Sequence, residues 1–234
     1  RPFYQVVNLD LTGKSKPREA SRLAMDSLEN NPNNFSDSKT RYRHGMPLSE
    51  SARWLMTWMQ YDITGVHSIA VDDSRVGSPA RYPKKSALSI ISGVKIIGDN
   101  LFETMMLNNI PMDIEEELEG DINIWENDPQ MKAGPRYDLP GKLTNPGGIL
   151  KILTWPSRRI RLYRKGDKVT HYAITSGDSI DPTDTHRLES MSSYRPGKKE
   201  GTLSPYVQFY PGQFWKGYDS LLKSSSKYHQ PMNV

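Results

Sequence analysis

The ten residues from Leu153 to Leu162, LTWPSRRIRL, carry the strongest indication of the fold. A tryptophan and a proline stand directly before three arginines that alternate with apolar residues. Successive side chains of a β-strand point to opposite faces, so Ile160 and Leu162 would share one face and Arg159 and Arg161 the other. One face would then pack in a core, and the other would present guanidinium groups suited to phosphate oxygens. An ordinary solvated strand face explains the same residues equally well.

The chain around this stretch has the pattern of an antiparallel β-meander. Between Ile149 and Ile180, short apolar runs alternate with glycine-containing turns. We expect strands near Arg159–Tyr163 and Val169–Thr175, turns at Lys165-Gly166-Asp167 and Ser176-Gly177-Asp178, and a last strand at Tyr206–Tyr210.

Helical spacing dominates earlier in the chain. The clearest helix is Leu48–Tyr61, with Ser49 as its cap. Its expected buried stripe is Leu48, Ala52, Leu55 and Met59, with Trp54 and Trp58 packing beside it in the core.

Other early segments complete the expected order of elements. Helices are predicted at Arg18–Leu28 and at Leu101–Asn109, where Gly98-Asp99-Asn100 and Glu103 form a capping-box pattern. Strands are predicted at Tyr4–Leu9, at Val66–Val71 after Gly65 ends the long helix, and at Ala87–Ile97 as a strand or close hairpin. Helices early and strands late define an α+β fold.

Composition bounds the class of protein. The chain has 234 residues, a net charge of +4 and no cysteine, which excludes disulfides, thiolate zinc sites and cysteine nucleophiles. No apolar run approaches the roughly 20 residues that span a bilayer, so we expect a soluble, cytoplasmic protein. The first residues, Arg1-Pro2-Phe3-Tyr4, lack an initiator methionine and indicate a piece of a longer protein. We expect a first part at 1–148, a β-rich part at 149–222 and a polar tail at 223–234.

Two polar loops are candidates for function. The loop 33–47 places Phe35 among cationic side chains, and the loop 72–86 is broken by glycine and proline. A third segment, Met112–Asp128, carries acidic but no basic residues. It reads either as a solvated helix and loop or as a docking face for a basic partner.

The residues give little support for catalysis. The five histidines fall in separate segments; His67 and His171 are expected to be structural, while His44 and His186 lie in basic loops where a phosphate contact is an alternative. No phosphate-binding glycine loop, nucleophile elbow or zinc-protease motif is present. Asp72-Asp73 would suit a metal but more often serves as a turn. We therefore expect no enzyme, no metal and no cofactor.

Six segments, in order, resemble the large subunit (CasA) of the type I-E CRISPR surveillance complex, Cascade. They are Arg1–Gln5, the run from Ala52 to Gly65, the run from Gly98 to Asn108, Trp125–Pro129, Leu153–Leu162, and the stretch from His186 to Arg195. They are spread in order across nearly the whole chain and correspond to the middle and later part of the family's N-terminal domain. The resemblance implies a fragment without the family's C-terminal four-helix bundle.

The resemblance implies a non-enzymatic function. The family's large subunit reads the protospacer-adjacent motif in duplex DNA, aids strand separation and recruits a helicase-nuclease, while guide RNA pairing carries the remaining specificity. The implied partners are double-stranded target DNA, the crRNA-containing Cascade subunits and the helicase-nuclease effector.

The resemblance also assigns residues to contacts. By order along the chain, the family's minor-groove loop falls at Gly77–Lys85, although only Gly77 keeps its glycine character. The DNA-binding set is Gly77, Ser78, Ala80, Arg81, Lys84, Lys85 and, as the nearest match to a lysine finger, Arg187. The loop that contacts the guide or a subunit supplies Phe35, Lys39, Arg41, Arg43 and His44. Phosphates or a sister subunit are expected to meet Arg158, Arg159 and Arg161.

Two other functions remain open on the sequence. One is a metal-dependent nuclease that uses Asp72-Asp73 and a nearby histidine. The other is a basic scaffold protein of a ribonucleoprotein that reads no sequence.

Overall fold

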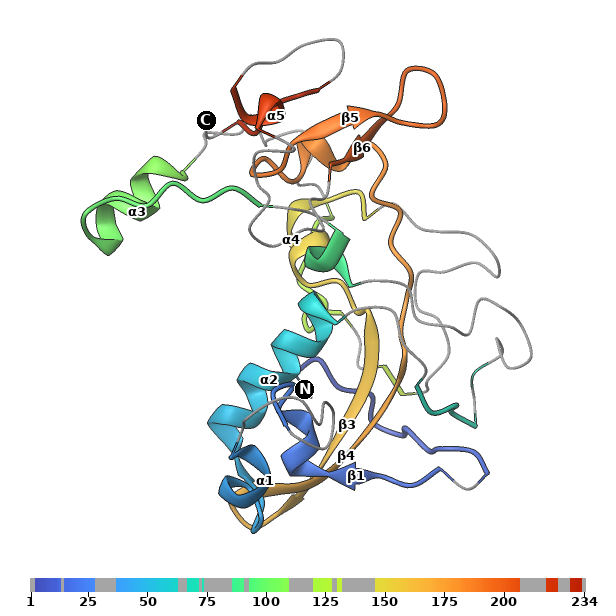
Figure 1. Cartoon of the computed structure of the whole chain (residues 1–234). Helices are drawn as coiled ribbons and strands as arrows, with labels where there is room; N and C mark the ends of the chain where they lie inside the picture. Colours follow the sequence, from blue (N-terminus) through green and yellow to red (C-terminus); the bar gives the residue numbers. More distant parts are fainter. Residues whose placement is uncertain are drawn as a thin grey trace. The chain divides into compact units, whose positions relative to one another are not determined.

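A computed structural model describes residues 3–13, 15–27, 37–62, 67–71, 73, 86–90, 93–109, 120–127, 130–131, 146–206, 218–222 and 228–232. The chain folds into two compact units, coloured along the sequence in Figure 1. Unit 1 consists of Arg1–Ser86, Asn123–Thr144 and Thr154–Ile180; unit 2 consists of Ala87–Ile122, Asn145–Leu153 and Asp181–Val234. Each unit draws residues from both sides of the boundary expected at residue 148.

Unit 1 is built on a long antiparallel hairpin. Strand β3 (Arg158–Lys165) pairs with β4 (Lys168–Ser176). The two strands are joined by a turn at Gly166, where the sequence predicts one. Gly166 has φ +63°, a backbone conformation that glycine adopts without strain. The other edge of β4 pairs with two short strands, β1 (Arg18–Glu19) and β2 (Met46–Pro47). Helices beside antiparallel strands confirm the α+β class.

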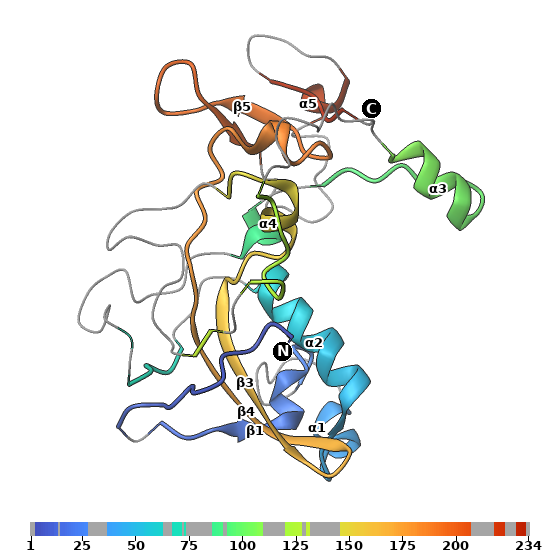
Figure 2. The ribbon, with the colours of Figure 1, turned by 180° about the vertical axis from the view of Figure 1, so that it is seen from behind.

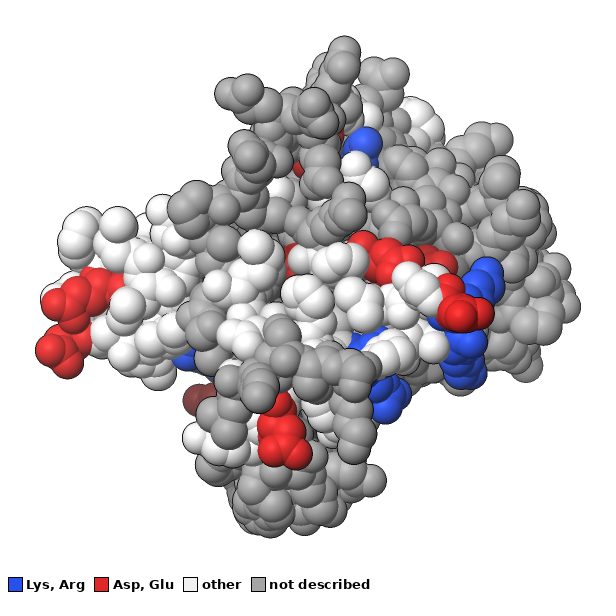
Figure 3. Space-filling view, turned by 90° about the horizontal axis from the view of Figure 1, so that it is seen from above, with Lys and Arg blue, Asp and Glu red and all other residues white. Residues whose placement is uncertain are grey.

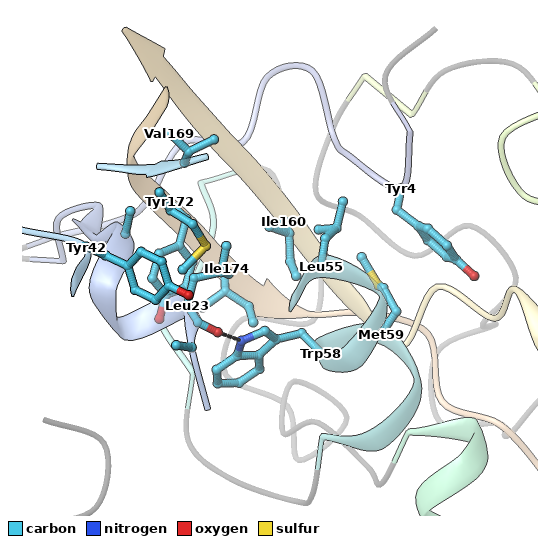
Figure 4. Packing of buried hydrophobic residues seen from close by; sticks show 13 residues of the cluster. Tyr4, Leu23, Tyr42, Leu55, Trp58, Met59, Ile160, Val169, Tyr172 and Ile174 are labelled. Carbon is cyan, nitrogen blue, oxygen red and sulfur yellow. Dashed lines mark hydrogen bonds between the residues drawn. The ribbon is translucent and has the colours of Figure 1, made fainter. Parts of the chain in front are cut away.

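Both faces of the hairpin are covered. Figure 2 shows β3 and β4 from behind as one long twisted ribbon, with α2 (Leu48–Tyr61) beside it. Ile160 and Ile174 are opposite one another in the register, and they pack with Leu55 and Met59 of α2 (Figure 4). On the other face, Ala173 packs in a smaller cluster with Val6, Leu9 and Ala70. The predicted alternation of Ile160 is therefore correct, but the opposite face is not simply solvated.

The helix α2 begins and ends where the sequence predicts, yet its buried stripe is rotated. Leu55, Trp58 and Met59 are buried, whereas Leu48, expected in the stripe, is 42% exposed. Ser49 makes no capping bond; the N-cap is Pro47, whose carbonyl accepts a hydrogen bond from the hydroxyl of Ser51. The indole Nε1 of Trp58 donates to the Leu23 carbonyl at 2.7 Å, drawn as the dashed line in Figure 4.

Unit 2 contains short elements. They are η3 (Ala87–Ile90), α3 (Leu101–Leu107), α4 (Ile149–Leu153), η4 (Thr185–Arg187), β5 (Tyr194–Pro196), β6 (Leu203–Pro205) and α5 (Asp219–Leu222). The capping box of α3 is confirmed: Asn100 Oδ1 accepts from the Glu103 amide at 2.9 Å, and Glu103 Oε2 accepts from the Asp99 amide at 2.8 Å. None of the described helices is long and apolar enough to cross a membrane.

Three strand predictions are wrong, because the described residues of these segments form no regular strand. Tyr4–Leu9 is irregular, although its Val6 amide donates to the Ile160 carbonyl at 2.9 Å. In Val66–Val71, residues 67–71 contribute only an isolated bridge between Ala70 and Leu11. Ala87–Ile97 begins instead as the 3₁₀ helix η3. These segments are held by a few separate tertiary hydrogen bonds rather than by a strand ladder, so their apolar residues give the pattern of a strand without forming one.

Three further expectations need correction or fall outside the description. In place of a helix over Arg18–Leu28, the chain forms β1 and then the 3₁₀ helix η1 (Ala20–Leu23). Ser176-Gly177-Asp178 makes no hairpin; the Gly177 amide returns to the Ser157 carbonyl at 3.0 Å and ends the pairing of β4. Gly65 and residues 207–210 of the predicted last strand lie outside the described residues, as does most of the acidic segment.

The core of unit 1 predicts a position-dependent cost for one substitution in α2. Leu55→Ala should lower the free energy of unfolding by about 2–5 kcal/mol, because the residue is 1% exposed and its removal leaves a cavity. Leu48→Ala, the same change in the same helix, should stay within about 0.5 kcal/mol. Urea denaturation followed by circular dichroism measures both. Equal losses would contradict the rotated stripe.

Candidate nucleic-acid interface

The first arginine of β3 is buried rather than presented to solvent. The Arg158 side chain is 1% exposed, and its Nε donates to Asp62 Oδ2 at 2.5 Å. Its remaining nitrogens donate to the carbonyls of Ser157 and Asp62. Asp62 is the C-cap of α2, so this ion pair ties the end of the helix to the start of the hairpin.

A histidine completes this buried cluster. His67 Nε2 lies 3.1 Å from Asp62 Oδ2, and the ring Nδ1 has no hydrogen-bond partner among the described residues. Burial lowers the pKa of His67, because the neutral ring avoids the cost of a desolvated charge beside Arg158. Burial alone would raise the pKa of Asp62, but hydrogen bonds from His67 and Arg158 and the charge of Arg158 hold it below its usual value. His67 is therefore structural, as the sequence predicts.

The second arginine is also buried, on the opposite face of the strand. Arg159 is 1% exposed, and its NH2 lies 2.8 Å from Asp178 Oδ1. Its NH1 donates to the Pro156 carbonyl at 2.7 Å. The carbonyl of Asp178 in turn accepts from the Trp155 indole at 3.0 Å. The ion pair thus joins the start of β3 to the segment after β4, at the end of the hairpin away from its turn.

These contacts correct the expectation for two of the three strand arginines. Arg158 and Arg159 have their guanidinium groups committed inside unit 1 and are not surfaces for a phosphate. Arg161 differs, since its side chain is 35% exposed and lies 3.7 Å from the exposed Asp10. Its guanidinium also lies 5.1 Å from the centre of the Tyr163 ring. Of the three, only Arg161 keeps an exposed cation.

The same cluster holds one end of the loop 72–86. The Ser86 amide donates to the Asp62 carbonyl at 3.0 Å, and its hydroxyl to the Trp58 carbonyl at 3.4 Å. At the other end, the Asp73 amide lies 3.4 Å from the Ala70 carbonyl, and Asp73 is buried. The predicted DNA-binding residues Gly77, Ser78, Ala80, Arg81, Lys84 and Lys85 lie outside the described residues. Both flanks of their loop are nevertheless fixed in unit 1.

The described part of the loop 33–47 forms a basic ridge. Helix α1 (Ser38–Arg41) begins it, and Lys39, Arg41, Arg43 and His44 are all exposed. Phe35 lies outside the described residues. The four predicted cationic and imidazole side chains of this short segment are therefore all accessible to solvent.

Buried neighbours fix this ridge to the sheet. The Ser38 hydroxyl donates to Asp26 Oδ1 at 2.9 Å, and the buried Tyr42 hydroxyl bonds to Glu50 of α2. Gly45 has φ +95°, and a side chain there would press on the Val169 carbonyl of β4. Glycine is required at this close approach. Arg41 is partly committed, with its NH2 3.4 Å from Glu50 Oε1.

The remaining predicted residues are not gathered with these loops. Arg187 ends η4 in unit 2, and its side chain lies outside the description. His186 is half-buried, with its ring 5.7 Å from that of Tyr194 and 5.5 Å from that of His229. Among the described residues, no group of three or more His, Asp and Glu side chains is arranged to hold a metal.

The acidic partners of the two buried arginines were not predicted from the sequence. Asp62 and Asp178 both stand within two residues of the end of a regular element, where an aspartate usually reads as a turn or cap. Ser86 carries no signal of its own at the end of a polar loop. The apolar residues around Trp155 were the available sign that the neighbouring arginines would be buried.

Known proteins resemble this chain along its whole length. The model of the family described as CRISPR-associated protein Cse1 matches residues 1–234. A curated relative, CRISPR-associated protein CasA/Cse1 of Thermus thermophilus, is 27% identical over 224 residues, which is 94% of this chain and 40% of the relative. The chain therefore spans less than half of that relative's length.

Solved structures share the fold. The crystal structure of Cse1 from Acidimicrobium ferrooxidans superposes with a TM-score of 0.74 at 25% identity, over 99% of this chain and 43% of the other. A chain of a CRISPR RNA-guided surveillance complex superposes with a TM-score of 0.54 at 19% identity, over 81% of this chain and 37% of the other. The second likeness concerns the fold alone.

The buried ion pair predicts a strong effect of removing one partner. Asp62→Asn should lower the free energy of unfolding by about 3–5 kcal/mol, because it leaves the Arg158 charge buried without its counterion. Asp10→Asn, which removes the exposed partner of Arg161, should change it by less than about 1 kcal/mol. Urea denaturation at pH 7 measures both. A cost no larger for Asp62 than for Asp10 would contradict the structural role of the cluster.

The low pKa of His67 predicts an acid sensitivity. In the unfolded chain His67 takes up a proton near the ordinary histidine pKa of 6.5, whereas the folded protein resists protonation until lower pH. The stability contributed by His67 is therefore complete above this pH and is lost as pH falls below it, by at most about 1.4 kcal/mol per pH unit. Unfolding midpoints followed from neutral to mildly acidic pH, compared with those of His67→Gln, isolate this contribution. An identical pH dependence in the variant would refute it.

Proposed function

The chain belongs to the Cse1 (CasA) family, the large subunit of the CRISPR Cascade complex, and on that premise we propose that it recognises the protospacer-adjacent motif in duplex DNA. In this proposal it works without catalysis of its own. It aids the separation of the target strands and contributes to the platform that recruits the helicase-nuclease. Because the chain spans 40% of the curated relative, these activities are proposed for the longer protein of which it would form a part.

The anchoring of the loop 72–86 is the observation that supports DNA recognition most directly. Its flanks, Asp73 and Ser86, are buried in unit 1, and Ser86 is bonded to the Asp62 carbonyl. A loop with fixed ends presents its intervening residues with a smaller loss of conformational entropy on binding than a free segment. The small side chains of Ser78 and Ala80 would leave room for the edge of a groove, and Arg81, Lys84 and Lys85 would meet phosphates.

The minor groove is the surface that this loop would suit. Its acceptor pattern distinguishes A·T from G·C pairs but little more, so tolerant reading of a short motif is expected there. Strict sequence selection is then supplied by the pairing of guide RNA with target DNA. Arg187 remains the residue that we propose as the counterpart of the family's lysine finger.

The ridge of the loop 33–47 is proposed to meet the guide RNA or a neighbouring Cascade subunit. Lys39, Arg43 and His44 are exposed, and Tyr42 fixes the backbone between them through its bond to Glu50. Phe35 would add an aromatic contact. Arg161, the least buried of the three arginines predicted to meet phosphates or a subunit, is proposed as a further contact of that kind.

The DNA-binding proposal is tested by the salt dependence of target binding. In the assembled complex, Lys84→Gln with Lys85→Gln should weaken binding of a motif-bearing duplex. The plot of log K against log salt concentration should become shallower by about 1.8, because each lost phosphate contact releases about 0.9 fewer counterions. Electrophoretic mobility shifts at several salt concentrations measure this slope.

A matched pair of lysines provides the control. Lys165→Gln with Lys168→Gln removes the same charge at the turn of the β3–β4 hairpin and should leave the slope unchanged. An unchanged slope in the Lys84/Lys85 variant would remove that loop from the interface. Equal binding of duplexes with and without the motif by the unaltered complex would instead favour a scaffold that reads no sequence.

A further inference from the structure

A polar hollow of about 480 Å³ lies in unit 2, beside the β5–β6 hairpin. One wall is formed by Thr202 and Ser204 at the hairpin and by two lysines of the connection between its strands. The segment that leads into η4 completes the lining through Asp181, Thr183 and Asp184. Its volume lies within the range of sites for small ligands, roughly 300–1,000 Å³.

The cations of the hollow are available to a ligand. Lys198 and Lys199 are exposed, and neither makes an ion pair with any residue that the structure describes. Arg195 is opposite Ser204 in the register, so its side chain lies on the same face of the hairpin. Its guanidinium is held 5.6 Å from the centre of the Tyr206 ring. The two lysines therefore give the hollow a cationic side that suits a phosphate, and Arg195 lies on the adjoining face of the hairpin.

The carboxylates of the hollow are already oriented. Asp181 Oδ1 accepts from the Thr183 amide at 3.0 Å, and Asp184 Oδ1 accepts from the Leu203 amide at 2.6 Å. Asp184 has a left-handed backbone, φ +58°, which aspartate and asparagine tolerate better than most residues. In each carboxylate the second oxygen has no partner among the described residues. These oxygens accept hydrogen bonds but repel anions.

The ligand must therefore carry both an anion and a hydrogen-bond donor. Figure 3 shows the face seen from above, where some acidic and basic side chains are neighbours. A phosphodiester alone satisfies the lysines but is repelled by Asp181 and Asp184. A ribonucleotide satisfies both sets, since its phosphate meets the lysines and its 2′-hydroxyl donates to a carboxylate. Deoxyribose lacks that donor.

We propose that the β5–β6 hollow binds a ribonucleotide of an RNA strand, with Lys198 and Lys199 on its phosphate and Asp184 on its 2′-hydroxyl. The hydroxyl groups of Thr202 and Ser204 are further hydrogen-bonding groups in the lining of the hollow. The choice of RNA as the macromolecule rests on the proposed function within an RNA-guided complex. The site itself lies in a different unit from the loops proposed above to read DNA and the guide.

The test uses two probes that differ only in the 2′-hydroxyl. Fluorescence anisotropy of labelled octauridylate and of its deoxyuridine counterpart is measured with the full-length protein. The RNA should bind about tenfold more tightly, because only its 2′-hydroxyl can donate a hydrogen bond to the Asp184 carboxylate, and tenfold corresponds to about 1.4 kcal/mol. Lys198→Gln with Lys199→Gln should make the salt slope shallower by about 1.4, since single strands release about 0.7 counterions per contact. Lys165→Gln with Lys168→Gln should not.

Asp184→Asn tests the discrimination itself. Asparagine keeps an oxygen acceptor for the Leu203 amide and tolerates the left-handed backbone, so the fold should persist. The preference for octauridylate over the deoxy probe should fall to near unity. Equal binding of the two probes by the unaltered protein, no binding of either, or equal losses in the two lysine variants would overturn the proposal. Motif-bearing duplex binding by the complex is scored separately, so a failure of the hollow is distinguishable from a failure of DNA recognition.

Discussion

The ion pair between Arg158 and Asp62 is the interaction on which unit 1 depends. It joins the first residue of β3 to the C-cap of α2, and the Asp62 carbonyl also accepts the amide of Ser86. Hairpin, helix and the end of the loop 72–86 therefore meet at one buried carboxylate and its own backbone. A buried pair of this kind contributes little net stability compared with an apolar replacement, but it fixes geometry, because removing one partner leaves an uncompensated charge.

This arrangement explains why the arginine-rich sequence of β3 wrongly predicted that Arg158 and Arg159 would contact phosphates. Arg158 and Asp62 are separated by 96 residues, whereas Arg159 and Asp178 lie much closer along the chain. Neither spacing marks a pair, because only the closed fold brings the charges together. The residues next to an arginine in the sequence do not show whether a distant carboxylate will pair with it. The distinction between buried and solvated cations is therefore a property of tertiary structure and not of the strand pattern.

Elements whose stability is local were predictable from the sequence, and the others were not. The α2 helix, the capping box at Asn100 and the turn at Gly166 follow from periodicity, side-chain capping and backbone freedom within a few residues. Segments such as Tyr4–Leu9 carry apolar residues because they cover the hairpin, not because they extend a ladder. For the interface, the basic ridge was predicted as a segment, while the anchors beneath it, Tyr42 and Gly45, were not.

Burial of two arginines also changes what the interface can be expected to do. Each phosphate contact adds about 0.9 to the salt slope for duplex DNA, so excluding Arg158 and Arg159 lowers the slope expected from these residues by about 1.8. The remaining candidate cations lie on loops and on one exposed strand position, Arg161. Loops can change their binding residues without disturbing a core, provided that their ends are fixed. Arg158 therefore acts on nucleic acid indirectly in our proposal, because it fixes Asp62, whose backbone carbonyl holds one end of the loop 72–86.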